Sequence, residues 1–287
     1  MHLRPRDVTV LVLCGRSPRH LYVANQLCAS THVAAIVQET GSPVAVNVLR
    51  NLRRPNIIAR KAWRWMRDRR RYIGDREAKF FFGDLPPRLD RPDLIVQVNT
   101  VNDPVVVDLA ERHNPDLIAV FGTSLIRGPL LDMGRHGMLN LHGGLSPHYR
   151  GADCTFWALY NREPQRIGCT IHFIDRGIDT GRLIAHVCPE IGPADDELSL
   201  FWRGVRDAAD VYAEAILRLG SGESLGVQQN EKGSLYQVKQ RGLRHEIAVQ
   251  RLLAGGLLRD VRLPRRVQWF NADTQHSAAE TSLIGTA

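Results

Sequence analysis

Three polar side chains stand where apolar runs of the sequence give way to glycine-rich loops. The run MLNLH ends in Asn140 and His142, and Asp179 lies in the turn DRGIDTG that follows a second apolar run. Because alternate residues of a strand point to the same face, we expect Asn140 and His142 to lie side by side. Such an amide and imidazole can donate hydrogen bonds to a negatively charged oxygen, and an imidazole beside a carboxylate can move a proton near neutral pH. None of these roles requires a metal ion or a covalent nucleophile.

The loop after His142 offers space for a ligand above these side chains. Gly143 and Gly144 let the backbone turn without placing a side chain there, and α/β sheets commonly bind ligands where their strands end. An isolated Asn or His at a strand end is more often a turn former or a structural group. The prediction of a site therefore depends on all three polar residues occurring together.

Four motifs around these residues carry a family resemblance. In order, they are N-L-H, S-P followed by Y-R-G, G-C-T-I-H-F, and G-I-D-T-G. The region 138–184 resembles the core of the 10-formyltetrahydrofolate-dependent formyltransferases, the family of the glycinamide ribonucleotide, methionyl-tRNA and amino-sugar formyltransferases. Several motifs in register are far more specific than one short pattern. The resemblance implies that Asn140, His142 and Asp179 are the catalytic trio and that 10-formyltetrahydrofolate is the formyl donor.

The resemblance also implies a wider set of binding residues. The turn after the apolar run 116–122 matches the place where the family binds the folate pterin through backbone groups, with a plain strand end as the alternative. Arg150 could instead support its loop, His172 could pack in the core, and 15–17 could be a simple turn rather than an anion-binding loop. The predicted donor-binding residues are Ser124, Leu125, Ile126, Asp175, Gly177 and Ile178. The predicted acceptor-binding residues are Gly15, Arg16, Ser17, Gly143, Gly144, Arg150 and His172.

Strand-like and helix-like segments alternate along the chain and predict a doubly wound α/β fold with a mainly parallel sheet. The fully apolar run DLIAVFG is typical of a buried parallel strand. Asp103 and Pro104 suit a helix start as cap and first-turn residues, and Asn114 and Pro115 suit its end. The predicted strands are 7–15, 33–38, 94–98 and 116–122, and further helices are predicted at 20–29, 155–160 and 193–219.

The glycine-rich stretch GSGESLG predicts a boundary after the last of these helices. We expect a formyltransferase catalytic domain at 1–219, a small C-terminal extension at 220–270, and a flexible tail at 271–287. Within the extension, the segment 233–262 predicts a small strand and one or two helices.

Composition narrows the class of protein. Hydrophobic residues make up 44% of the chain, enough for a sizeable core, but no apolar run approaches the roughly 20 residues that cross a bilayer. The start of the chain is a poor signal peptide. Its five cysteines are scattered without a C-x-x-C pair, so we expect neither a zinc site nor a redox centre. We therefore expect a cytoplasmic protein without membrane insertion, and we do not expect Cys154 to act as a nucleophile.

The segment 50–76 is the strongest charge feature, since its many arginines are interleaved with Trp63, Trp65, Met66 and Tyr72. One interpretation is a basic aromatic surface for nucleic acid or anionic lipid. We favour the other, an amphipathic helix whose aromatic residues pack on the body while its arginines face water. The formal net charge of +8 and the pI near 9.6 favour anionic partners without identifying them.

The acceptor is the least determined part of the prediction. Methionyl-tRNA formyltransferases carry a fuller C-terminal barrel than this extension suggests, and glycinamide ribonucleotide formyltransferases are little more than the core. We therefore expect a small, phosphorylated primary amine, with a nucleotide-linked amino sugar preferred, and we do not expect nucleic acid. The sequence is compatible with a homodimer and does not decide the oligomeric state. The alternatives are a methionyl-tRNA or glycinamide ribonucleotide acceptor, formyltetrahydrofolate hydrolysis, and a nucleic-acid-binding protein on a non-catalytic core.

Overall fold

A mixed eight-stranded sheet forms the centre of the molecule. The computed structural model describes residues 8–41, 55–71 and 73–271. In the order of the sheet, the strands are β10 (Arg266–Trp269), β8 (Leu183–Cys188), β7 (Cys169–Phe173), β5 (Met138–His142), β4 (Leu117–Phe121), β1 (Thr9–Cys14), β2 (His32–Glu39) and β3 (Ile95–Val98). From β3 to β5 neighbouring strands are parallel, and from β5 to β10 they are antiparallel. The predicted α/β class with a mainly parallel sheet is confirmed.

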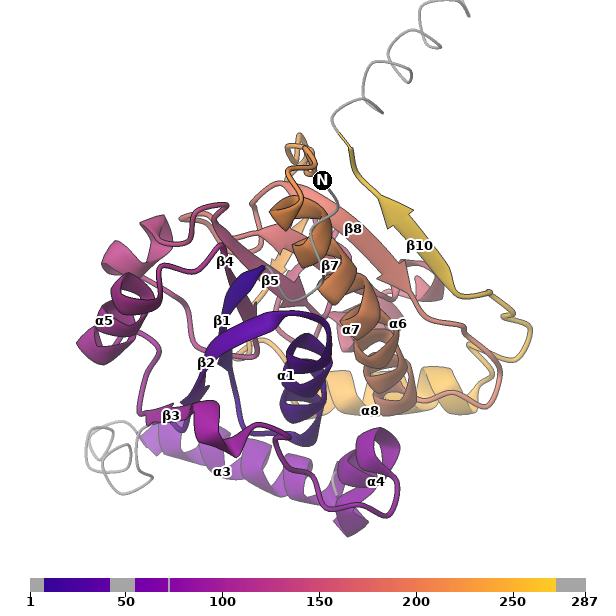
Figure 1. The fold of residues 1–287 in the computed structure, drawn as a ribbon. Coiled ribbons are helices and arrows are strands. Elements are labelled where there is room, and N and C mark those ends of the chain that lie inside the picture. Colours follow the sequence, from indigo (N-terminus) through magenta and orange to yellow (C-terminus); the bar gives the residue numbers. More distant parts are fainter. Residues whose placement is uncertain (1–7, 42–54, 72, 272–287) are drawn as a thin grey trace, which may run out of the picture.

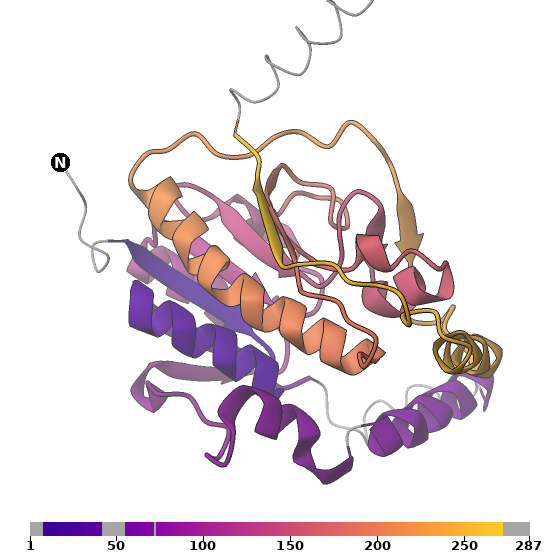
Figure 2. The same ribbon diagram turned by 90° about the vertical axis from the view of Figure 1, so that its right-hand side faces the viewer.

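Helices cover both faces of this sheet, as the alternation along β1 requires. Val10, Val12 and Cys14 pack into one core with α1 (Pro18–Ser30), α4 (Arg76–Phe82) and α7 (Glu197–Gly220). Leu11 and Leu13 point the other way, into a core with α5 (Pro104–His113) and the short 3-10 helix Gly128–Asp132. Figure 1 and Figure 2 show α1 and α7 side by side on one face.

Capping residues place the helix ends close to where the sequence predicts them. Asp103 accepts a hydrogen bond from the Val105 amide at 3.1 Å at the start of α5, and Asn114 closes that helix in the left-handed region. The last long helix, α7, begins at Glu197 rather than at the predicted residue 193. The reason is that Asp196 is its cap and exchanges hydrogen bonds with Ser199.

The C-terminal residues extend the sheet and add a smaller one. β10 pairs antiparallel with β8, while β9 (Ser234–Tyr236) pairs in parallel with β6 (Tyr149–Gly151) beside α6 (Cys154–Tyr160). Together with α8 (Leu243–Ala254), they supply the predicted strand and helix of segment 233–262. The division at residue 220 stays a prediction, and residues 272–287 of the predicted tail lie outside the described residues.

The basic segment forms helix α3 (Pro55–Arg71), which lies next to α8 (Figure 2). Residues 50–54 and 72 lie outside the described part of the chain. The predicted orientation of the helix is wrong, because Trp65 is 60% exposed whereas the Arg67 and Arg71 side chains are only 11% and 18% exposed. These two arginines turn inward because Glu246 and Glu197 face them from the body, at 3.4 Å and 2.7 Å.

A buried hydroxyl joins α7 to the middle of the sheet. Tyr212 Oη accepts a hydrogen bond from the Val120 amide at 2.8 Å and donates to the carbonyl oxygen of Leu139 at 2.9 Å. Val120 and Leu139 belong to β4 and β5, where the ladder between these strands comes to its end. The hydroxyl therefore completes the pairing directly beneath the end of β5.

Tyr212→Phe should lower the free energy of unfolding by about 2 kcal/mol, because it leaves a buried amide and a buried carbonyl without their partner. Urea denaturation followed by circular dichroism measures the change. Tyr160→Phe is the matched control, since no hydrogen bond of the Tyr160 hydroxyl is found within the described residues. Equal stability of the two variants would contradict the bridging role.

Candidate active site

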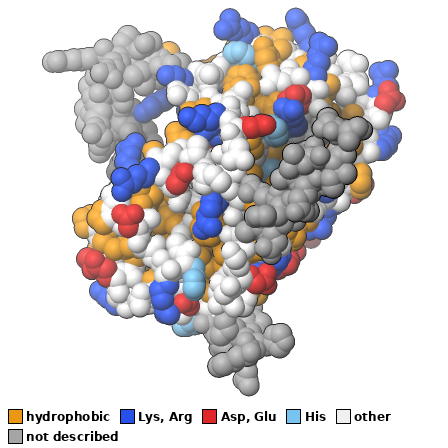
Figure 3. Space-filling view, turned by 90° about the horizontal axis from the view of Figure 1, so that it is seen from above, with side chains coloured by type: hydrophobic (Ala, Val, Ile, Leu, Met, Phe, Trp, Pro, Cys, Tyr) orange, Lys and Arg blue, Asp and Glu red, His pale blue; other side chains and the backbone are white. Residues whose placement is uncertain are grey.

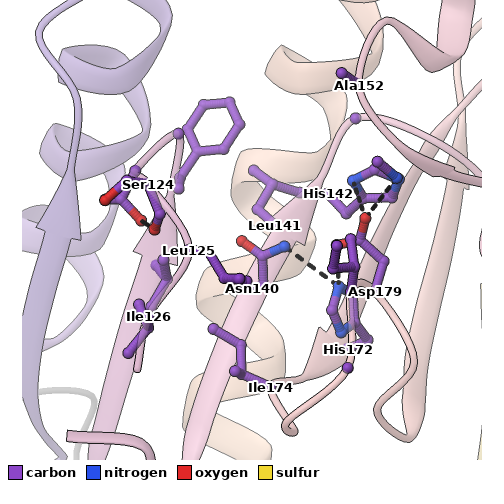
Figure 4. Close-up of a pocket in the computed structure, with 18 of the residues that line it drawn as sticks. Ser124, Leu125, Ile126, Asn140, Leu141, His142, Ala152, His172, Ile174 and Asp179 are labelled. Carbon is purple, nitrogen blue, oxygen red and sulfur yellow. Dashed lines mark hydrogen bonds and ion pairs between the residues drawn. The ribbon is translucent and has the colours of Figure 1, made fainter. Parts of the chain in front are cut away.

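The predicted trio comes together at the ends of β5 and β7, with His172 as a fourth member (Figure 4). Asn140 and His142 lie two residues apart on β5, and His172 stands directly opposite Asn140 in the antiparallel register of β7. Asp179 arrives from the turn that follows β7 and contacts both imidazoles. The side-by-side placement of Asn140 and His142 predicted from strand alternation is confirmed, because both side chains line one pocket.

His172 fixes the orientation of the Asn140 amide. Its ring is 2% exposed, and its Nδ1–H donates to the carbonyl oxygen of Phe173 at 2.7 Å. A neutral ring then carries a lone pair at Nε2, which accepts from Asn140 Nδ2 at 3.2 Å. One amide hydrogen of Asn140 is used in this bond, and the other stays available toward the pocket.

Asp179 is a largely buried carboxylate that groups from three other segments of the chain contact. Its Oδ2 accepts from the Gly151 amide at 2.7 Å and lies 3.5 Å from His142 Nδ1, and its Oδ1 lies 3.4 Å from His172 Nε2. Burial raises the pKa of the carboxyl group, but a proton on the His142 or His172 imidazole, together with the Gly151 amide, outweighs this effect and holds the pKa well below its usual range. Gln229 Nε2 fixes the turn itself by donating to the carbonyl oxygens of Asp179 and Gly181 at 3.1 Å and 2.7 Å.

His142 is neutral at physiological pH. Burial lowers its pKa, and the opposing effect of Asp179, which raises the pKa as predicted, is the smaller of the two. Its Nε2–H donates to the carbonyl oxygen of Tyr149 at 3.1 Å, so the neutral ring presents an unprotonated Nδ1 toward Asp179. His142 can therefore accept a proton at Nδ1, where the carboxylate would stabilise the imidazolium.

Cys154 lies within reach of this histidine without being reactive. Its Sγ stands 3.6 Å from His142 Nε2, and burial raises the pKa of its thiol well above the ordinary value. A thiolate nucleophile is therefore disfavoured, as the sequence predicts. Among the described residues, no group of three or more His, Cys, Asp or Glu side chains could hold a metal ion. No helix in the described part of the chain is long and apolar enough to cross a membrane.

A pocket of about 510 Å³ opens above these side chains. Leu125 and Ile178 line it with 46% and 40% of their surfaces exposed, so both offer apolar surface to a ligand. All the residues predicted to bind the donor line this pocket, namely Ser124, Leu125, Ile126, Asp175, Gly177 and Ile178. Glu39 secures their first loop by accepting from the amide and hydroxyl of Ser124 at 2.6 Å and 2.7 Å.

Some of the residues predicted to bind the acceptor lie at the pocket, and others lie away from it. Gly143 lines the pocket, and a side chain at Gly144 would come within 2.7 Å of His142 Nε2. Arg150 supports the surrounding loops, because it donates to the carbonyl oxygens of Ile178 and Gly233 at 3.4 Å and 3.0 Å. The loop 15–17 lines neither this pocket nor the adjoining one at His142. It supports α1 instead, with Ser17 as the cap, so its role in binding stays a prediction.

One wall of the pocket, formed by residues 235–238, was not predicted from the sequence. Residues 235–238, which follow from β9, line it opposite the loop 122–126. No local pattern marks these residues, because the pairing of β9 with β6 brings them to the site from far along the chain. Gln229, which fixes the Asp179 turn, was missed for the same reason.

Comparison with known proteins identifies the fold and its family. The Formyl transferase family model matches residues 19–216. The chain belongs to the formyl transferase family. Methionyl-tRNA formyltransferase of Geobacter sulfurreducens is 35% identical over 144 residues, which cover 50% of this chain and 45% of the relative. The match thus spans less than half the length of this curated relative.

Solved structures of the family share the fold over most of the chain. A sugar N-formyltransferase from a Shewanella species is 17% identical with a TM-score of 0.54, covering 85% of this chain and 87% of its own. A 4-N formyltransferase from Francisella tularensis is 15% identical with a TM-score of 0.55, covering 84% of this chain and 86% of its own. The predicted resemblance to this family is confirmed, and the acceptor is not decided by fold similarity at such identities.

A buried arginine, Arg241, connects the wall formed by residues 235–238 to the rest of the site. The Arg241 side chain is fully buried and donates to Asp153, to both carboxylate oxygens of Glu197, and to Glu246, at 2.7–2.9 Å. Its guanidinium carbon also lies 3.7 Å from the centre of the Phe156 ring. Asp153 follows Gly151 by two residues, so this arginine connects the segment after β9 with the backbone that holds Asp179.

Arg241→Met should lower the free energy of unfolding by about 3–5 kcal/mol, because it leaves three carboxylates without their shared cation. Urea denaturation measures the loss. Arg265→Met is the control, since its contact with Asp207 is a long one of 3.8 Å from a half-exposed side chain. A loss no larger than that of the control would contradict the anchoring role of Arg241.

The pKa of His142, followed by NMR titration of its ring, should lie below the ordinary value of 6.5, since burial disfavours the imidazolium. Asp179→Asn should lower this pKa further, because the carboxylate is the group that raises it. Asp175→Asn, a change in the same turn, is the control and should leave the His142 titration in place. A His142 pKa above 6.5, or a rise in Asp179→Asn, would contradict the charge distribution described here.

Proposed function

We propose that this protein transfers a formyl group from 10-formyltetrahydrofolate to the primary amine of a small anionic acceptor, with a nucleotide-linked amino sugar as the first candidate. The observation that carries the proposal is the contact set of Asn140, His142, His172 and Asp179 at the pocket floor. Its members, Asn140, His142 and Asp179 among them, lie in the motifs by which the sequence resembles the family. No other described pocket contains both an oriented amide donor and an imidazole–carboxylate pair.

Each side chain has a role in such a transfer. Asn140 uses its remaining amide hydrogen to stabilise the oxygen that becomes negative when an amine attacks the formyl carbon, an effect of about 3 kcal/mol in comparable acyl transfers. His142 accepts the proton that the attacking amine loses, and Asp179 stabilises the resulting imidazolium. The proton then passes to the folate nitrogen as the bond between that nitrogen and the formyl carbon breaks, which releases tetrahydrofolate. His172 acts through Asn140, since its lone pair holds the amide in place.

The pocket suits the flat, partly apolar end of a folate donor. Leu125 and Ile178 offer apolar surfaces on two sides, and the loop 122–126 offers backbone groups to the edge of a heterocycle. Of the described residues at the rim, Asp175 is the acidic one besides Asp179, and its Oδ1 accepts from Gly177 and Thr180. These contacts support residues 124–126 and 175–178 as the donor-binding set.

Methionyl-tRNA is the second candidate for the acceptor. The sequence relatives that bear the name methionyl-tRNA formyltransferase support it, although their match covers less than half of their length. The preference for a small molecule rests on the C-terminal segment, which here folds back as β9, α8 and β10 onto the core.

The deciding experiment measures tetrahydrofolate release from 10-formyltetrahydrofolate with and without candidate amines. The panel contains UDP-, GDP- and dTDP-linked amino sugars, glycinamide ribonucleotide and charged initiator tRNA. We expect release that depends on a nucleotide-linked amino sugar, with a mass gain of one formyl group. Release without any amine would identify a hydrolase, release with the tRNA would identify the second candidate, and failure to bind the folate would overturn the proposal.

Asp179→Asn should reduce kcat by a factor of about 100–1,000 while the protein still folds and still binds the folate, because the imidazolium loses its stabilising charge. Steady-state kinetics and folate binding by fluorescence separate the two effects. Asp132→Asn is the control and should retain kcat, since Asp132 is exposed and lines none of the described pockets. Normal turnover of Asp179→Asn would refute the role assigned to this carboxylate.

A further inference from the structure

A basic pocket of about 520 Å³ lies between α3 and residues 238–243. The described residues that line it include four cations, Lys61, Arg64, Lys239 and Arg241, and no Asp or Glu. Arg241 is neutralised by its three half-buried carboxylate partners. Within the described residues, none of the other three cations is paired with a carboxylate, so this pocket has a local excess of positive charge.

Arg64 differs from the arginines that follow it on α3. Arg67 contacts Asp68 and Glu246, and Arg71 contacts Glu197, each within 3.4 Å. The Nε of Arg64, in contrast, is buried and has no hydrogen-bond partner in the described structure. Since a buried donor without a partner is costly, this atom points to an acceptor group that a ligand would bring.

Arg64 also connects the basic pocket to the catalytic side chains. It lines a second pocket, of about 420 Å³, which His142, Gly143 and Gly151 also line. Those three residues line the pocket of about 510 Å³ that is proposed for the donor as well. The basic pocket and the second pocket therefore share Arg64, and the second pocket and the proposed donor pocket share His142.

The unpaired cations Lys61, Arg64 and Lys239 line the basic pocket together with apolar side chains, and they do not form a broad basic surface. Trp63 presents its indole to the basic pocket, and its ring is also contacted by Arg67 at 5.5 Å. Elsewhere, on the face in Figure 3, Lys and Arg side chains are dispersed among apolar and acidic ones. A half-open pocket of this volume suits a single nucleotide better than it suits a nucleic-acid helix.

We infer that Arg64, Lys61 and Lys239 bind the diphosphate of a nucleoside-diphosphate-linked acceptor whose amine reaches His142, with the Trp63 indole beside the nucleoside. The inference rests on the proposed function and adds to it the position and the residues of the phosphate subsite. The two negative charges of a diphosphate diester would leave one of these three cations without a partner, whereas the single charge of a carboxylate would leave two. α3 is thus part of the acceptor site.

Binding of UDP, GDP and dTDP by isothermal titration calorimetry tests this subsite without turnover, with uridine as the probe that lacks phosphate. We expect at least one nucleoside diphosphate to bind and uridine not to bind. Arg64→Gln should weaken the diphosphate at least tenfold and Arg64→Lys less, because lysine retains the charge. Arg69→Gln is the matched control on α3, since Arg69 lines none of the described pockets and stacks on the exposed Trp65.

Kinetics with the amine that proves active separate this inference from the proposed function. Arg64→Gln should raise the KM for that amine about tenfold while kcat stays within about twofold, because the subsite lies away from the reacting atoms. Unchanged KM, or no binding of any nucleoside diphosphate by the wild type, would overturn the phosphate subsite and leave the transferase proposal intact. Binding of an RNA oligonucleotide that Arg64→Gln abolishes, without diphosphate binding, would also overturn it in favour of a nucleic-acid surface.

Discussion

The arrangement of the site depends on keeping one carboxylate ionised in a place that water hardly reaches. Asp179 is 12% exposed, and burial alone would favour its neutral form. The Gly151 amide donates a hydrogen bond to this carboxylate, and either imidazole stabilises its charge when it takes up a proton. The backbone of Asp179 adopts a left-handed φ of 52° to bring the carboxylate there. Stabilising this one charge requires four elements in position, namely the ends of β5 and β7, the turn after β7, and the strand β6.

The C-terminal residues also help to hold the Asp179 carboxylate in position. Gln229 holds the turn of Asp179, β9 pairs with the strand that donates the Gly151 amide, and Arg241 binds Asp153 two residues further on. Through Glu197 and Glu246, the same cluster meets α3. Helix α3 and the backbone that holds Asp179 are therefore connected through one partly buried set of charges.

Local sequence patterns were sufficient for the core and for the catalytic residues. Apolar alternation and capping residues such as Asp103 determine where β1, α5 and β4 begin and end, and N-L-H places its two side chains through strand geometry alone. The orientation of α3 could not be predicted, because the carboxylates that turn its arginines inward lie far along the chain. The same is true of residues 235–238, which reach the site only through the pairing of β9.

Val238 lines both the donor pocket and the basic pocket. A single short segment thus forms a wall of each, between β9 and the buried Arg241. Any ligand that moves or orders this segment from one side changes the shape of the site on the other side, and the resulting coupling free energy is the same in both directions. The two substrates of such an enzyme would bind with linked affinities. The substrate that orders the segment around Val238 would bind first.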